Sequence, residues 1–159
     1  MGVKRIMEKQ QILEAFKDYE VYLASLNTSV QTDEEAHAPI AEGKWSISQI
    51  LYHMAEWDRF IREERINQME PGREVGTFPE VDTFNREAVR SVDNYRFPEV
   101  LSHAQRQRAL LGKVIEEMPE ENWNSAFRIS GNSMTPADYF EGILEHDAHH
   151  RRQIDGFLA

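Results

Sequence analysis

Apolar residues recur every three or four positions over four long stretches of the chain, the spacing that places them on one face of an α-helix. In the first stretch this stripe consists of Ile12, Phe16, Tyr19, Leu23 and Leu26. The pattern predicts four amphipathic helices, over about residues 4–26, 46–69 and 98–118 and from residue 135 onward.

Three of the predicted helices begin with recognisable N-terminal signals. Ser46 precedes Gln49 by three residues, which is the arrangement of a capping box. Pro98 suits the first turn of the third helix, where a missing backbone N–H costs nothing. Thr135 is a good N-cap for the fourth helix and is followed directly by Pro136. These signals fix where the helices start better than where they end.

The segments between the helices are polar and contain proline and glycine. Residues 27–44 are predicted to form a loop, and 119–134 an irregular segment with a short extended stretch at 125–129. Residues 71–97 form a long connection with a short helix around 82–92, long enough to carry the chain back across the molecule. Four helices with apolar faces in 159 residues predict an all-α four-helix bundle, forming one domain over 1–159.

Composition excludes several classes of partner and chemistry. The net charge of −10 disfavours nucleic acid, which needs dense cationic patches. No apolar run approaches the ~18 residues of a membrane span, and charged residues interrupt the N-terminus before a signal-peptide core, so we expect a cytoplasmic protein without a membrane partner. The chain has no cysteine. A metal would therefore need His, Asp or Glu ligands, and thiol chemistry would need an external thiol.

Three histidines fall within five residues of the fourth helix. The apolar stripe from Ile143 to Ile154 passes through His146 and His150, which lie four residues apart and so one turn apart on one face. His149 falls on the charged side. Two imidazoles on an apolar face need polar partners, and one divalent cation would satisfy both. The simpler alternative is that they are ordinary polar residues near a helix end.

His53 supplies a third candidate ligand from the second helix. A single histidine beside an apolar stripe is more often a core residue than a ligand, but together with His146 and His150 it completes three imidazoles. This is the ligand count of a catalytic site with open positions, and imidazole suits zinc, nickel, iron or copper. His37, in an acidic loop, and His103, on a charged helix face, are expected to be incidental.

Two other metal motifs do not fit. The segment HDAHH differs from the H-E-x-x-H motif of zinc proteases because Asp147 replaces the glutamate, and Gly156 stands where the extended motif needs a histidine. A di-iron bundle needs two E-x-x-H motifs, and the single instance, Glu34 to His37, lies in the proline-containing loop. Neither class is expected.

Residues near the histidines have two possible roles each. Three aromatic residues are candidates for substrate contact, although core packing is the simpler role: Tyr52, Trp57 and Tyr139. Three acidic residues are either hydrogen-bond partners of the ligand histidines or solvated surface charges: Glu56, Asp58 and Asp147.

The segments KWSISQILYHMAEWDRF, VDTFNREAV and EHDAHHRRQI together resemble the DinB-like superfamily of metal-binding four-helix bundles. In that family a Trp-Ser opening leads to one histidine, and a C-terminal H-x-x-x-H followed by Arg-Gly-Gln supplies two more. The resemblance implies His53, His146 and His150 as ligands; Arg152 replaces the usual glycine. It also implies an up-down-down-up bundle and commonly a homodimer.

The resemblance implies several activities. Members of the family include S-transferases and isomerases that use a low-molecular-weight thiol, and proteins described only as metal-dependent hydrolases. We therefore expect a metalloenzyme, with zinc or nickel in an open three-histidine site, that activates a thiol or water against a small electrophilic substrate. The alternatives are a non-catalytic bundle that sequesters a metal or small molecule, and a bundle whose histidines only bond to one another.

Overall fold

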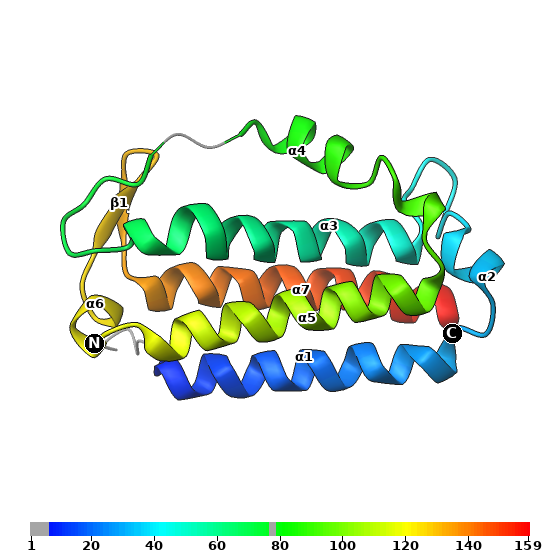
Figure 1. Cartoon of the computed structure of the whole chain (residues 1–159), viewed down its shortest axis with the longest axis horizontal. Helices are drawn as coiled ribbons and strands as arrows, with labels where there is room; N and C mark the ends of the chain where they lie inside the picture. The colour runs from blue at the N-terminus through cyan, green and yellow to red at the C-terminus, as the bar shows by residue number, and fades with distance from the viewer. Residues whose placement is uncertain (1–6, 77–78) are drawn as a thin grey trace, which may run out of the picture.

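Four long helices form the frame of the computed structural model, which describes residues 7–76 and 79–159 (Figure 1). They are α1 (Lys9–Ser29), α3 (Ile47–Phe60), α5 (Phe97–Glu117) and α7 (Pro136–Leu158). Helices α1 and α7 run in one direction and α3 and α5 in the other, so the topology is up-down-down-up (Figure 1). The predicted all-α four-helix bundle is confirmed.

The helix starts follow the capping signals. The Ser46 hydroxyl accepts a hydrogen bond from the backbone N–H of Gln49 at 3.1 Å, and the Gln49 side chain accepts one from the backbone N–H of Ser46 at 2.9 Å. Thr135 caps α7 in the same way through Asp138. Helix α1 starts at Lys9 and ends at Ser29, three residues later than predicted. The predicted start at Lys4 lies outside the described residues.

The connections contain more regular structure than the sequence predicts. The expected loop 27–44 includes a short helix, α2 (Asp33–His37), whose N-terminus is capped by Thr32. A five-residue helix is too short to show a periodic apolar stripe, so the prediction of loop throughout was wrong here. The long connection carries the predicted short helix as α4 (Val81–Ala88), followed by a 3-10 turn, η3 (Val92–Asn94).

The segment between α5 and α7 forms a short helix, α6 (Glu120–Trp123), and a hairpin. Strand β1 (Phe127–Ile129) is the predicted extended stretch, and it pairs antiparallel with β2 (Asn132–Met134). Ser130 and Gly131 join the strands, both with positive φ, 49° and 79°. This conformation is the one that two-residue hairpin turns require.

Helix α3 does not end with an ordinary α-helical turn. It continues into a π-helical turn, η1 (Ile61–Arg65), and then a 3-10 turn, η2 (Ile66–Gln68). The side chains of Ile61, Arg65 and Ile66 are all buried. The helical segment therefore ends at Gln68, one residue before the predicted position.

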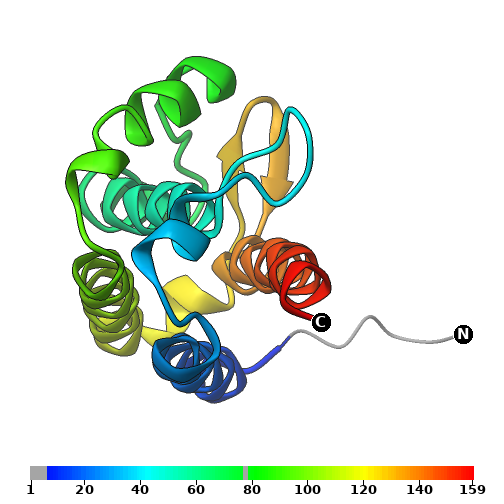
Figure 2. The ribbon, with the colours of Figure 1, turned by 90° about the vertical axis from the view of Figure 1, so that its right-hand side faces the viewer.

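The bundle is closed more tightly on three sides than on the fourth. Viewed end-on, the four helices lie at the corners of a square, with α4 outside α3 (Figure 2). Helix α5 packs closely against both α3 and α1, and α1 packs against α7, whereas α3 and α7 approach each other less closely. The space between α3 and α7 is therefore available for side chains that bind a ligand. Among the helices formed by residues 7–76 and 79–159, none has the length and apolar character to cross a membrane.

Candidate metal centre

The structure brings together the three histidines that the sequence singles out. His53 extends from α3, and His146 and His150 extend from α7. One ring nitrogen from each of the three lies within 4.8 Å of the others. His53 is buried and His150 half-buried, but His146 is exposed. Although its side chain is partly open to solvent, His146 directs a ring nitrogen toward the other two histidines, and the adjacent Asp147 is buried. His146 lies at the opening of the site.

The orientation of His53 follows from its neighbours. Its Nδ1 donates a hydrogen bond to the backbone carbonyl of Ile50, one turn earlier on α3. A carbonyl can only accept, so Nδ1 carries the proton and Nε2 keeps its lone pair. The ring of Trp45 packs edge-on against the imidazole, with centroids 4.7 Å apart. His53 is thus held as a neutral imidazole whose Nε2 is available to bind a metal ion.

His150 is oriented in the same way by a side chain. Its Nδ1 donates to the Oε1 atom of Gln153 at 2.8 Å, and its Nε2 lies 3.1 Å from the Nε2 of His146. Tetrahedral zinc with Zn–N bonds of about 2.0–2.1 Å separates two ligand nitrogens by about 3.3–3.4 Å. The observed spacing is close to that value. The α7 pair therefore fits a single metal ion without a large rearrangement.

All three imidazoles are neutral at physiological pH. Burial, with a smaller contribution from His150, lowers the pKa of His53 to about 3. Burial and His150 lower the pKa of His146 to about 4. The pKa of His150 is also lowered, mainly by burial. A metal competes with protons for imidazole nitrogens, so the site is ready for a cation without first losing protons.

A buried ionic network lies beside the histidines. Arg108 on α5 donates to Asp58 through Nε at 2.8 Å and through a terminal nitrogen at 3.3 Å. It also donates to Asp147 at 2.6 Å and 2.9 Å. The exposed fractions of Arg108, Asp58 and Asp147 are 1%, 3% and 8%. The guanidinium also stacks on Tyr19, 4.1 Å from its ring centroid. The network carries a net charge of −1 and joins the two helices that bear the histidines.

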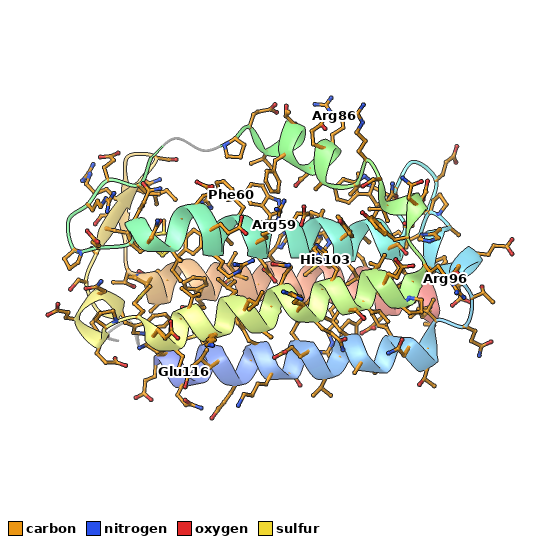
Figure 3. All side chains as sticks on the ribbon, viewed as in Figure 1. Arg59, Phe60, Arg86, Arg96, His103 and Glu116 are labelled. Carbon is orange, nitrogen blue, oxygen red and sulfur yellow. The ribbon has the colours of Figure 1, made fainter. Side chains whose placement is uncertain are left out.

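The acidic residues near the histidines do not have the roles expected from sequence. Asp58 and Asp147 bind Arg108 rather than a ligand histidine, and neither is a solvated surface charge. Glu56 pairs with His103 at 3.0 Å and with Arg59 at 2.9 Å; His103 extends from α5 toward α3 (Figure 3). The groups that do orient the candidate ligands are the Ile50 carbonyl and Gln153.

Sequence reasoning missed Arg108 and Gln153. Gln153 follows His150 by three residues, a spacing that places both on one helix face and could have identified it. Arg108 had no such signal, because an arginine in a charged segment of α5 resembles any exposed arginine. Its burial depends on aspartates from two other helices.

The remaining candidates divide between packing and the site. Tyr52 stacks on Tyr95 and His103, with centroids 5.6 Å and 4.6 Å away, and so packs between elements. Tyr139 bonds to Arg65, the last residue of η1. Trp57 lies closer to the histidines, because it lines the same cavity as His146. His37 bonds to the Tyr95 carbonyl at 2.9 Å.

Two cavities border the histidine cluster. The first, which we call the α4 cavity, has a volume of about 270 Å³ and is lined by Trp57, Asn85 and His146 among others. The second has a volume of about 230 Å³ and is lined by Trp45, His150 and Gln153, together with Ile40, Gly43, Lys44 and Ile50. Both are slightly smaller than the ~300–1,000 Å³ range of small-molecule sites, so each has room for a small ligand only.

One histidine from α3 and two from α7 meet at one point within a four-helix bundle. This combination of fold and side chains is that of a helical bundle with a candidate metal site. The sequence profile of the DinB superfamily matches residues 11–154. The chain therefore belongs to the DinB superfamily. A search of curated proteins found no match.

Two solved structures are similar in fold. YfiT from Bacillus subtilis, described as a probable metal-dependent hydrolase with an unusual four-helix bundle topology, is 14% identical with a TM-score of 0.77. The match covers 99% of this chain and 90% of that one. A mycothiol-dependent maleylpyruvate isomerase is 13% identical with a TM-score of 0.71, over 94% of this chain and 62% of that one. At these identities the likeness shows the fold alone.

Proposed function

We propose that the protein is a metal-dependent enzyme in which His53, His146 and His150 bind one divalent ion, zinc or nickel. The observation that carries the proposal is that three neutral imidazoles converge, two of them oriented by hydrogen bonds at Nδ1. When bound, such an ion acts as a Lewis acid and lowers the pKa of a water or thiol in an open position.

The chain supplies orientation, charge and exclusion of water around this site. Ile50 and Gln153 hold two ligands in one tautomer. The net charge of −1 on the network around Arg108 favours a cation next to three neutral ligands. Apolar side chains of the α4 cavity, such as Met54 and Ile143, reduce the water around a bound substrate.

Two reactants fit this arrangement better than one. Separate cavities reach the cluster through His146 and through His150. A reaction between a small electrophile and a low-molecular-weight thiol would use both, and the thiol must come from outside because the chain has no cysteine. Of the two proteins of similar fold, one is described as a probable metal-dependent hydrolase and the other as a mycothiol-dependent isomerase. Hydrolysis and a thiol-dependent reaction are therefore both candidate reactions for this fold. We favour transfer of a thiol to the electrophile, or its thiol-assisted isomerisation, over hydrolysis.

Metal content tests the site directly. We expect about one equivalent of zinc or nickel in wild-type protein purified without a histidine tag, and almost none in His150→Ala. His149→Ala, one residue away and exposed, is the matched control and should keep its metal. Less than about a tenth of an equivalent in wild type, with no tight binding of added zinc or nickel, would refute the proposal.

Turnover tests the enzyme. The metal-loaded protein should consume electrophilic substrates in the presence of a thiol such as glutathione, bacillithiol or mycothiol, and chelation should abolish the activity. Metal binding without turnover of any substrate would instead identify a sequestering protein.

A further inference from the structure

The α4 cavity has an apolar wall and few polar groups available to a ligand. Its apolar side chains come from α3, η1, α4 and α7: Met54, Trp57, Ile61, Val81 and Ile143. Asp58, Arg108 and Asp147 also border it, but they bind one another. The polar side chains that remain are His146, which belongs to the histidine cluster, and Asn85 on α4.

The orientation of the Asn85 amide is fixed by Trp57. The indole Nε1 of Trp57 donates to the Oδ1 atom of Asn85 at 2.7 Å. Since an indole N–H can only donate, the amide oxygen must be the atom that faces it. The NH₂ group is then left with two hydrogens, and Nδ2 bonds to no other group within the part of the chain that the structure describes. Asn85 therefore offers a donor to the cavity that it lines.

Aromatic packing holds this amide in place. The ring of Trp57 lies 4.0 Å from that of Phe84, the residue before Asn85, and 5.7 Å from that of Phe60. Phe60, which lies on the side of α3 that faces α4 (Figure 3), also contacts Phe84, with ring centroids 5.6 Å apart. A donor fixed before binding loses little conformational entropy when a ligand arrives.

We propose that Asn85 determines substrate specificity: its Nδ2 donates to a carbonyl or carboxylate oxygen of a small apolar molecule bound in the α4 cavity. The molecule lies between this amide and His146, so its acceptor oxygen is directed toward α4 and another part of it toward the histidine cluster. The statement that the bound molecule is a substrate rests on the proposed function. The statement that the cavity selects a molecule with an acceptor oxygen is independent of it.

Asn85→Asp is the sharpest variant, because it keeps an oxygen for the Trp57 indole and replaces the donor with an acceptor. Three branched probes of similar size distinguish the polar group: 4-methylpentan-2-one, 4-methylpentanoate and 3-methylbutylamine. Their binding to protein incubated with zinc is measured by ¹H–¹⁵N NMR titration, following the Asn85 NH₂ and Trp57 indole resonances. An indole N–H that still exchanges slowly with water in Asn85→Asp shows that its hydrogen bond to residue 85, and with it the cavity wall, is intact.

Wild type should bind the ketone and the carboxylate with a shift of the Asn85 NH₂ resonance, and bind the amine more weakly. In Asn85→Asp the two acceptor probes should bind about tenfold more weakly, the cost of one hydrogen bond, and the amine more tightly. Asn85→Leu should weaken the acceptor probes without favouring the amine.

The inference is overturned if wild type binds neither acceptor probe, or if Asn85→Asp binds all three as wild type does. Metal content is measured on the same samples. Loss of metal binding with intact probe selectivity would reject the proposed function and keep the role of Asn85. Normal metal content without probe selectivity would reject the role of Asn85 and keep the proposed metal site.

Discussion

Arg108 donates two hydrogen bonds to Asp147, at 2.6 Å and 2.9 Å, and Asp147 is the residue next to His146. The same guanidinium binds Asp58, one residue after Trp57 on α3. A buried side chain of α5 thus joins the two helices that carry the histidines, which pack against each other less closely than either packs against its other neighbour.

Replacing Arg108 by methionine should lower the free energy of unfolding by about 3–5 kcal/mol, because two buried carboxylates lose their partner. Urea denaturation measures the effect. Arg106→Met, exposed on the same helix, should change stability by less than about 0.5 kcal/mol. Replacing all three charged residues by apolar ones of similar size should recover most of the loss. A small effect of Arg108→Met would mean that the network contributes little.

Gln153→Ala should weaken zinc binding by about 10- to 100-fold, because His150 loses the acceptor that fixes its tautomer. Gln153→Glu keeps an acceptor at that position and should retain most of the affinity. Competition with a chromophoric chelator measures both constants. Arg152→Ala, the exposed neighbour, serves as the control, and equal affinities in Gln153→Ala and Arg152→Ala would contradict the role of Gln153.

Metal should stabilise the folded protein, because its three ligands meet only when α3 and α7 are in place. With free zinc at a hundred times its dissociation constant, the free energy of unfolding should rise by about 2.7 kcal/mol. Thermal denaturation with zinc and with chelator tests this. The increase should persist in His149→Ala and disappear in His53→Ala. An equal increase in His53→Ala would place zinc elsewhere.

The metal-free protein should lose stability in mild acid through His53. Burial, and secondarily His150, lowers the pKa of His53 to about 3 from an unfolded value of 6.5. Below pH 6.5 the unfolded chain takes up a proton that the folded protein rejects until about pH 3, so stability falls across that window and is unaffected above it. The loss is about 2 kcal/mol at pH 5.

Comparison with His53→Gln isolates this effect, since other groups titrate in both proteins. Urea denaturation of chelator-treated samples at pH 7.5 and pH 5 should show a larger drop in wild type than in the variant. Equal drops would mean that His53 is protonated as readily in the folded protein as in the unfolded chain.

The helices could be predicted because each long apolar stripe is a local property of the sequence. Ile12, Phe16 and Leu23 are buried as their spacing indicates, and Ser46 caps α3 as expected. Helix α2 was missed because it has one turn and one buried residue, Ala36. The strand β2 was missed because the two strands of the hairpin are only three residues long, too short to show an alternating apolar pattern, although Ser130 and Gly131 form a dipeptide typical of turns.

The candidate ligands could be selected from helical spacing, but their surroundings could not. The four-residue interval between His146 and His150 places both on one face, whatever the rest of the fold does. Which group binds Asp58 or lines the cavity beside Trp57 depends on contacts between helices far apart in the sequence. Arg108 and Asn85 are such cases, and the metal role of the three histidines remains a prediction.

The π-helical turn at Ile61–Arg65 holds one residue more than an α-helical turn would, because its hydrogen bonds span five residues instead of four. Each added residue rotates the subsequent part of the helix by about 100°. The direction in which Arg65 and Ile66 point around the helix axis is therefore offset from that of His53. The direction of His53 is fixed by the start of α3 at Ser46, at the other end of the helix. A relative with an unbroken α-helix here should be one residue shorter in this segment, and an insertion or deletion at this turn would change the far end of the bundle while leaving the histidine register unaltered.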